Sequence, residues 1–523
     1  MADPRGFIKI TERDIPGERS VNERLSDYCD VHEKIEGRPQ IDKTEPQASR
    51  CMDCGVPFCH FSCPLGNIIP EFNDLVWNRK WREAYHRLSL TNNFPEFTGR
   101  LCPALCEQGC VLGSINPAVT IKNIELAISD IAFRREYVHP IPAEKVTGKT
   151  VAIIGSGPAG LTAAQQLTRA GHTVVVFEKD KKPGGLMRYG IPNFKMEKKI
   201  IDRRIYQIEA EGVRFRCGVK IGGNGKNDLS FEELRQRFDA VLIATGSSVP
   251  NDLKMEGREL NGIHFAMDFL PDATRAVLGE EIVNEDGAKR EMLSAQGKNV
   301  LIIGGGDTGS DCLGTSLRQG AKMVTTLQVM PQPPKERDGE ASDSARRFYG
   351  KQPWPTYPSL YTPSSSIEEG EETGKSSYLW ETTATKFVGD EQGNDRAAVL
   401  ANVEFKDGKF LPIEGTEREI PVDLVLISVG FKGPETETLF GGGKLGSDHA
   451  LEVKMGPRAI ARDDNFQTSL ENVFVAGDAG RGQSLIVWAI AEGRSAAAAI
   501  DRHLEGETEL PEPILVSTVA LRK

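Results

Sequence analysis

Apolar runs alternate with glycine turns and helical periodicity in the middle of the chain. Residues 151–154 form a short apolar run, a glycine motif follows, and apolar positions then recur with helical spacing up to a second run at residues 173–177. This order predicts a strand, a helix and a parallel strand, which is one βαβ unit. The same order recurs over residues 299–327, where Gly304 matches Gly155. The sequence therefore predicts two nucleotide-binding units.

Further apolar segments are expected to complete both sheets. Residues 240–246 (AVLIATG) and 422–430 (VDLVLISVG) are each typical of a strand that ends in a small-residue turn. Residues 472–478 (NVFVAGD) and an alanine-rich helix over residues 485–500 return the chain to the first unit. The predicted fold class is α/β, with two Rossmann-like dinucleotide-binding domains of the two-dinucleotide flavoprotein type behind a mainly helical N-terminal domain.

Changes in composition mark the expected domain limits. Residues 1–144 hold clustered cysteines among turns and short helices, which predicts a small domain held together by a cofactor. The first dinucleotide-binding domain is expected over residues 145–265 and 455–523, and the second over residues 266–454. Residues 331–389 are rich in Pro, Ser, Glu and Gly, so they predict a surface insertion of the second domain.

The bulk composition limits the kind of partner. A chain of 523 residues exceeds what one hydrophobic core usually organises, so several domains are expected. The formal net charge of -11 leaves no basic face for nucleic acid or an anionic membrane, which favours a small molecule or another protein. Residues 1–10 lack the pattern of a signal peptide and no stretch has the length of a membrane span, so we expect a cytoplasmic protein.

Seven of the ten cysteines fall into two tight groups before Val111. The first group is close to the bacterial ferredoxin pattern, in which a run of four cysteines ends in proline and the last cysteine binds a second cluster. Two 4Fe-4S clusters need eight ligands, so one ligand is another residue or the clusters are fewer. The groups are Cys51-x2-Cys54-x4-Cys59-x3-Cys63-Pro64 and Cys102-x3-Cys106-x3-Cys110.

Structural zinc is the main alternative for these cysteines. Zinc sites usually show separated Cys-x2-Cys pairs, so the continuous run favours iron and sulfide. His60 lies inside the run and is either a ligand or a polar loop residue, whereas Cys29, Cys217 and Cys312 stand alone and are expected to be inert thiols. The nucleotide domains contain no Cys-x2-Cys pair, which argues against a thioredoxin reductase and leaves clusters as the exit for electrons.

The first glycine motif, GSGPAG, predicts a site for FAD. Its glycines permit close approach of a pyrophosphate, and Glu178 stands at the spacing expected for a carboxylate on a ribose. Asp478 follows a later strand, where an aspartate of two-dinucleotide flavoproteins holds the ribitol of FAD; the alternative is a capping residue. The residues assigned to FAD are Gly155, Gly157, Pro158, Ala159, Gly160, Glu178, Lys179, Gly185, Leu186, Ala244, Thr245, Gly246, Gly477, Asp478, Gln483 and Ser484.

The second glycine motif, GGGDTG, is expected to bind the nicotinamide nucleotide. The position that matches Glu178 by sequence offset is Leu327, followed by Gln328, so the acidic partner of the motif is missing. Lys335 and Arg337 follow, and basic groups there suit a 2′-phosphate, which predicts NADPH rather than NADH. The residues assigned to this nucleotide are Gly304, Gly306, Asp307, Thr308, Gly309, Lys335, Arg337 and Gly430.

Four segments resemble the small subunit of glutamate synthase: residues 50–72 (RCMDCGVPFCHFSCPLGNIIPEF), 94–109 (FPEFTGRLCPALCEQG), 304–312 (GGGDTGSDC) and 482–494 (GQSLIVWAIAEGR). The resemblance covers nearly the whole chain, and a similar module occurs in dihydropyrimidine dehydrogenase. It implies two 4Fe-4S clusters that share the cysteines in an interleaved way, with a glutamine or glutamate in the eighth place. Carried over by position, Cys51, Cys54, Cys59 and Cys110 hold one cluster, and Cys63, Cys102, Cys106 and Glu125 hold the other. Without that resemblance Glu125 is a surface glutamate on an amphipathic helix.

The same resemblance implies the electron-input subunit of glutamate synthase. Such a chain takes hydride from NADPH or NADH onto FAD and passes electrons through the clusters to a large subunit, which makes glutamate from glutamine and 2-oxoglutarate. No catalytic side chain is expected, because hydride transfer needs only the two bound cofactors in the right placement. Residues 328–334 (QVMPQPP) resemble the fused eukaryotic enzymes, which leaves the nucleotide preference open. The alternatives are an iron-sulfur flavoprotein that serves another partner such as ferredoxin, or a zinc-containing nucleotide-binding regulator.

Overall fold

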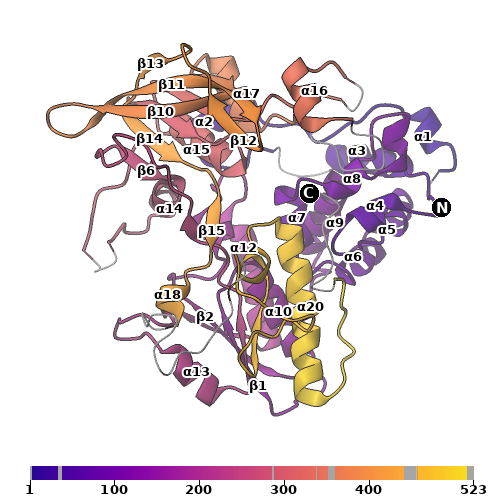
Figure 1. Ribbon diagram of the computed structural model, residues 1–523. Coiled ribbons are helices and arrows are strands. Elements are labelled where there is room, and N and C mark those ends of the chain that lie inside the picture. Colours follow the sequence, from indigo (N-terminus) through magenta and orange to yellow (C-terminus); the bar gives the residue numbers. More distant parts are fainter. Residues whose placement is uncertain are drawn as a thin grey trace.

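The chain forms three regions in the computed structural model (Figure 1). A helical N-terminal region lies beside a first parallel sheet, and a second parallel sheet carries an antiparallel sheet on one face. This arrangement confirms the predicted α/β fold class. Within the described part of the chain, every helix is too short or too polar to cross a membrane. The structure describes residues 3–32, 38–284, 288–336, 339–351, 360–440, 455 and 458–514.

The N-terminal region is a set of short helices around an apolar core. Phe72, Val76 and Leu88 are fully buried against Ile124 and Ile128 of the long helix α9. Cysteines lie in this core and in the loops around it, so the region is built around its thiols. The helices are α1 (Gly6–Lys9), α2 (Val21–Ser26), α3 (Arg38–Ser49), α4 (Phe58–Ser62), α5 (Ile69–Trp77), α6 (Trp81–Ser89), α7 (Pro95–Leu101), α8 (Leu105–Gln108), the 3-10 helix η1 (Val111–Ser114) and α9 (Ile121–Arg134).

The first sheet has the strand order β16-β4-β1-β2-β3, with parallel pairing throughout. Its strands are apolar on both faces because helices cover both: α10, α12 and α20 lie on one face and α13 on the other. The last strand, β16, returns from the C-terminal part of the chain. The elements are β1 (Thr150–Ile154), α10 (Pro158–Arg169), β2 (Thr173–Glu178), α11 (Leu186–Tyr189), α12 (Lys198–Glu211), β3 (Arg214–Cys217), α13 (Phe231–Arg237), β4 (Ala240–Ile243), β16 (Val473–Val475), α19 (Asp478–Arg481) and α20 (Ile486–Glu505).

The second sheet has the parallel order β6-β14-β7-β8-β9. Helices α14, α15 and α17 cover one face, and strands β10 and β11 of the antiparallel sheet cover the other. The elements are β6 (Ile263–Phe265), α14 (Ala266–Val277), β7 (Asn299–Ile303), α15 (Asp307–Arg318), β8 (Met323–Gln328), α16 (Asp343–Tyr349), α17 (Ser365–Thr373), β9 (Ser376–Trp380), β10 (Thr382–Gly389), β11 (Asp395–Lys406), β12 (Lys409–Pro412), β13 (Arg418–Pro421), β14 (Leu424–Ile427) and α18 (Thr436–Leu439).

The surface insertion predicted over residues 331–389 is wrong in its second half. Helix α17 packs on α15, and β9 forms the edge of the second sheet. Ile367 and Glu369 are buried, and the Arg318 guanidinium donates to the two carboxylate oxygens of Glu369 at 2.7 and 2.9 Å. The polar composition concealed this helix because its buried charge is paired rather than solvated.

The boundary predicted between the two nucleotide-binding domains, at residues 265 and 266, also differs from the structure. Strand β6 pairs with β14, so the second sheet already begins at Ile263. The two nucleotide-binding regions are connected by a small antiparallel ribbon of β5 (Val249–Pro250) and β15 (Phe431–Gly433).

Candidate functional site

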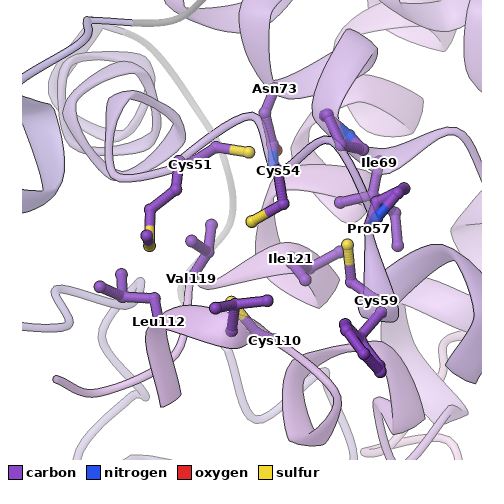
Figure 2. A pocket seen from close by; sticks show the side chains of 14 residues that line it. Cys51, Cys54, Pro57, Cys59, Ile69, Asn73, Cys110, Leu112, Val119 and Ile121 are labelled. Atoms are coloured by element: carbon purple, nitrogen blue, oxygen red, sulfur yellow. The ribbon is translucent and has the colours of Figure 1, made fainter. Parts of the chain in front are cut away.

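Four cysteines surround one cavity in the N-terminal region, and Figure 2 shows their side chains around the same space. Cys51 and Cys54 lie in the loop after α3, Cys59 lies in α4, and Cys110 precedes η1. Mostly apolar side chains line the rest of the cavity. Burial raises the pKa of Cys51 to about 11, so this thiol is neutral until a metal displaces its proton.

The remaining three grouped cysteines lie with Glu125. Burial raises the pKa of Cys63 to about 12 and that of Cys102 to about 11, and the nearby Glu125 carboxylate raises both further. Burial raises the pKa of the Cys106 thiol, and the nearby Cys63, Cys102 and Glu125 raise it further. Around the cavity, Cys110 likewise raises the pKa of its three neighbours, Cys51, Cys54 and Cys59. The fold thus places Cys110 with Cys51, Cys54 and Cys59, and Cys63 with Cys102 and Cys106; that each set holds a cluster stays a prediction.

One carboxylate oxygen of Glu125 accepts hydrogen bonds from two neighbouring side chains. It lies on α9 and is only 5% exposed, so the alternative of a surface glutamate is wrong. Its Oε1 accepts a hydrogen bond from the Asn92 amide at 2.7 Å and another from the Thr98 hydroxyl. Both bonds end on Oε1. Burial raises the pKa of Glu125 to about 7.

Other polar residues near the cysteines differ in their relation to the cavity. The fully buried amide of Asn73 lines it, and its contact with the Cys51 thiol opposes the effect of burial on the pKa of that thiol. His60 is not part of the lining; its ring packs against Phe61 with centroids 5.4 Å apart. His60 lies in α4, so the expectation of a loop residue is wrong, and its place outside the lining argues against a ligand role. The isolated cysteines lie outside both sets.

The first glycine loop has the shape of a pyrophosphate cradle. A Cβ at Gly155 would lie 2.5 Å from the backbone O of Ala244, and a Cβ at Gly160 would lie 2.1 Å from the O of Gly155. A Cβ at Gly157 would meet no atom within 4 Å among the described residues. The first and last glycines therefore serve close packing, and the middle one leaves open space at the N-terminus of α10. Beside the loop, the buried Thr245 hydroxyl lacks a hydrogen-bond partner in the described part of the chain.

Glu178 is fixed at the end of β2. Its Oε2 accepts from the backbone N–H of Ser156 at 3.1 Å and from the Ser156 hydroxyl, and its Oε1 accepts from the N–H of Asp180 at 3.0 Å. Burial raises the pKa of the Glu178 carboxyl. The Gly185 turn closes over the loop, since a Cβ there would lie 2.9 Å from Gly157 Cα. Of the assigned neighbours, Lys179 and Leu186 are exposed.

The C-terminal turn brings Asp478 to the same loop. Gly477 approaches Ala159 so closely that a Cβ on Gly477 would lie 2.8 Å from the Ala159 Cβ. The Ser484 hydroxyl and backbone N–H donate to Asp478 Oδ1 at 2.7 and 3.1 Å. Burial raises the pKa of Asp478 to about 6, so hydrogen-bond donors of a ligand would favour its charged form.

Sequence reasoning missed the carboxylate that holds this turn. Glu492 of α20 is fully buried, and its oxygens accept from the Gly477 N–H at 2.9 Å and from the Arg462 guanidinium at 2.7 and 2.8 Å. Arg481 adds a fourth bond at 3.1 Å. The only signal in the sequence is that Glu492 stands among the small apolar residues in the first half of the terminal helix.

The second glycine loop repeats the first. A Cβ at Gly304 would lie 2.4 Å from the backbone O of Ser428, and a Cβ at Gly309 would lie 2.0 Å from the O of Gly304. A Cβ at Gly306 would meet no atom of the described residues within 4 Å. Asp307 and Thr308 begin α15, whose N-terminus opens on this space.

The residue that corresponds to Glu178 is not Leu327, as the sequence offset predicted. The N–H of Gly155 donates to the O of Phe177 at 2.8 Å, and the N–H of Gly304 donates to the O of Leu327 at 3.0 Å. Leu327 therefore corresponds to Phe177, and Gln328 corresponds to Glu178. The turn between α15 and β8 is one residue longer than the turn between α10 and β2, which shifts the register of the sequence alignment.

The remaining residues predicted to bind the nicotinamide nucleotide are two basic residues after β8 and Gly430 at the junction of the two nucleotide-binding domains. Lys335 is exposed in the loop after β8, and Arg337 lies outside the described residues. Gly430 reaches the first domain, because a Cβ there would lie 3.1 Å from Gln483 Oε1, and that oxygen accepts from the Phe431 N–H at 3.3 Å. The Lys195 ammonium also crosses the junction, at 2.5 Å from the Asp311 carboxylate of α15.

Comparisons with known proteins agree with this division. Residues 29–137 match the family described as dihydropyrimidine dehydrogenase domain II, 4Fe-4S cluster, and residues 149–352 and 377–493 match the pyridine nucleotide-disulphide oxidoreductases. The structure of Mycobacterium tuberculosis FprA in complex with NADPH covers 70% of this chain and 88% of its own, with 19% identity and a TM-score of 0.50, which supports the fold. The fold and sites define an iron-sulfur oxidoreductase with two dinucleotide-binding domains.

Full-length relatives identify the family. A glutamate synthase [NADPH] small chain of Mycobacterium tuberculosis is 51% identical over 523 residues and covers 100% of both chains. The Bacillus subtilis small chain is 41% identical over 98% of this chain and 100% of its own. A Schizosaccharomyces pombe glutamate synthase [NADH] is 42% identical over 97% of this chain, which spans 23% of that longer protein. The chain belongs to the glutamate synthase small-chain family.

Proposed function

We propose that this chain is the electron-input subunit of a glutamate synthase, which oxidises NADPH and supplies electrons to a large subunit. The observation that carries the proposal is the position of the two cysteine sets. Cys63 and Cys102 pack against the core of the first nucleotide-binding domain, whereas Cys51 and Cys59 pack in the core of the N-terminal region. One metal site therefore adjoins the flavin domain, and the other lies farther from it on the path to a partner.

The residues of both domains fit the groups that this function requires. Two 4Fe-4S clusters would take seven cysteines and Glu125, FAD would take the first glycine loop with Glu178 and Asp478, and NADPH would take the second glycine loop. When bound, FAD accepts hydride and each cluster accepts one electron, so the flavin converts a two-electron donor into one-electron carriers. The protein supplies the placement: buried thiols, an open cradle at each helix N-terminus, and the Glu178 and Asp478 carboxylates.

The partner and the location follow from the relatives and the thiols. The bacterial relatives carry the name small chain, while the S. pombe relative joins the equivalent region to a much longer chain. A separate large chain would supply the rest here, which makes the working enzyme a hetero-oligomer. All ten cysteines are free, which fits the reducing cytoplasm and the use of seven of them as ligands.

The function is tested with the purified chain alone and with its large partner. The chain alone should oxidise NADPH with ferricyanide or a tetrazolium dye as acceptor and form no glutamate from glutamine and 2-oxoglutarate. Adding the large chain should give glutamate. If the chain alone fails to oxidise either nicotinamide nucleotide with any acceptor, or forms glutamate alone, the proposal is wrong.

A cysteine pair provides the matched control. Cys54→Ser changes a thiol in the first set and should abolish glutamate formation with the large chain while NADPH oxidation by ferricyanide persists. Cys29→Ser makes the same chemical change at an exposed, isolated thiol and should leave both activities intact. Equal glutamate formation by the two variants would show that electrons do not leave through the first set.

A further inference from the structure

Gln328 occupies the same place in the second nucleotide-binding unit as Glu178 in the first. Besides the shared strand register, the side chains make corresponding local contacts. Oε1 of Glu178 accepts from the N–H two residues on, that of Asp180, at 3.0 Å, and Oε1 of Gln328 accepts from the N–H of Met330 at 3.4 Å. Both side chains are buried, Glu178 with 5% and Gln328 with 9% exposure.

The side chain of Gln328 also faces the second residue of its glycine motif, as Glu178 does. Ser156 at that place in the first motif donates to Glu178. In the second motif the residue is Gly305, and a Cβ there would lie 3.0 Å from Gln328 Nε2. The two units therefore present one side chain to the same point above the loop, with a carboxylate in the first and a carboxamide in the second.

Tyr378 of β9 fixes the orientation of this carboxamide. The Tyr378 hydroxyl donates to the backbone O of Gly305 at 2.9 Å and fills the space where a Gly305 side chain would lie, 1.8 Å from the Cβ position. A hydrogen bond with Gln328 opposes the effect of burial on the pKa of Tyr378. Since the Tyr378 hydroxyl donates its proton to the Gly305 backbone O, the Gln328 amide N–H is the donor in the bond between Gln328 and Tyr378.

A carboxylate and a carboxamide at this point treat a phosphate differently. In a Rossmann unit the acidic residue at the end of the second strand accepts the ribose hydroxyls of the adenosine, and it repels a 2′-phosphate because both are anions. A carboxamide has no charge and retains one oxygen acceptor and amide N–H donors. It can therefore serve either a hydroxyl or a phosphate.

We infer that Gln328 is the residue that contacts the 2′ position of the adenosine ribose and lets this site accept a 2′-phosphate. The inference rests on the proposed function, because it assumes that the second glycine loop binds the nicotinamide nucleotide. It assigns the specificity to the end of β8, rather than to the exposed Lys335 in the loop beyond it.

The test is Gln328→Glu, which recreates the chemistry of Glu178, with kcat/KM measured for NADPH and for NADH and ferricyanide as acceptor. The ratio of the two values should shift toward NADH by about 10- to 100-fold, mainly through a higher KM for NADPH. Gln332→Glu makes the same change at an exposed position four residues on and should shift the ratio by less than about 2-fold, since exposed charges are screened. Flavin absorbance should be unchanged in both.

A second variant keeps the inference falsifiable if Gln328→Glu folds poorly. Gln328→Lys should shift the ratio in the opposite sense, toward NADPH. An unchanged ratio in both Gln328 variants, a shift in the same direction by both, or an equal shift in Gln332→Glu would overturn the inference. These results differ from failure of the proposed function, in which the parent chain itself would oxidise neither nucleotide.

Discussion

The buried carboxylate of Glu492 should be essential for the flavin domain, and Glu492→Gln is the sharpest perturbation of it. The substitution keeps the shape and removes the charge. The carboxamide has one oxygen in place of two, so it cannot accept all four bonds that now end on Glu492, and its amide hydrogens face the guanidinium donors of Arg462 and Arg481.

Arg462 and Arg481 contribute unequally to the loss of folding stability expected for Glu492→Gln. The Arg462 side chain is 3% exposed, so its charge would be left buried without a carboxylate, with the Val475 backbone O and the Phe466 ring as its remaining contacts. Arg481 is 16% exposed and lies over the Trp488 ring at 3.9 Å, which lets water and the ring compensate for part of its loss. The perturbation therefore counts as one buried unpaired cation, which costs about 3–5 kcal/mol. For a domain of this size, about 3 kcal/mol corresponds to a fall in Tm of roughly 6–12 °C.

The same change should loosen the turn that carries Asp478. Glu492 accepts from the Gly477 N–H, so its loss frees the backbone immediately before Asp478. We expect FAD to bind at least about tenfold more weakly, which is about 1.4 kcal/mol of the total cost. Calorimetry gives the first quantity, and flavin fluorescence titration of the protein freed of FAD gives the second.

The control is Glu505→Gln at the exposed end of the same helix. An exposed glutamate without a structural role should change stability by less than about 0.5 kcal/mol and leave FAD affinity unchanged. If Glu492→Gln behaves like Glu505→Gln in both measurements, the carboxylate does not hold the turn and the reasoning from burial fails.

Two further predictions concern the metal and flavin ligands. Anaerobic analysis of the chain should find about eight iron and eight sulfide per molecule, and Glu125→Ala should change the spectrum of one cluster while Glu83→Ala, at an exposed position of α6, leaves both unchanged; stoichiometric zinc without sulfide would refute the assignment. Asp478 has a pKa of about 6 without a ligand, and ribitol donors would lower it, so FAD binding releases a proton. Affinity should then weaken by up to about tenfold from pH 7 to pH 5 and stay level above pH 7, and Asp478→Asn should abolish this dependence.

The parts of the fold that the sequence predicted are those with local periodicity. Each glycine motif lies between an apolar strand and a helix, and the packing of Gly155 and Gly304 on the neighbouring strand ends leaves no room for a side chain. Short-range patterns of this kind survive folding because the nearby chain alone imposes them. The cysteine spacing carries only part of its geometry in this way, because the fold places Cys110 with Cys51, Cys54 and Cys59, and Cys63 with Cys102 and Cys106.

What the sequence did not reveal depends on contacts between distant segments. Helix α17 is polar in composition, yet Glu369 is buried because Arg318 pairs with it from another helix. The register of Gln328 depends on a turn that is one residue longer than its counterpart, and offsets within a sequence do not show where a strand begins to pair. The partners of Glu492 likewise lie on separate turns, so its role appears only once those turns meet.

Helix α20 connects the two ends of the proposed electron path. Glu492 holds the turn of Asp478, and Arg494, two residues on, donates to the Asn93 side chain at 2.6 Å and to the Leu90 backbone O at 2.7 Å. Those acceptors precede α7, and Cys102 directly follows that helix.

Arg494 is 3% exposed, and burial lowers its pKa to about 10, so it stays charged at neutral pH and its hydrogen bonds are strong. The flavin turn and the nearer cysteine set are therefore fixed to one rigid helix by buried charges. In contrast, the ribbon of β5 and β15 joins the second nucleotide-binding domain to the first through two short strands. If FAD and a cluster bind at the proposed residues, packing along α20 would set the separation between them, so that docking or release of the nicotinamide nucleotide need not alter the distance that single electrons cross.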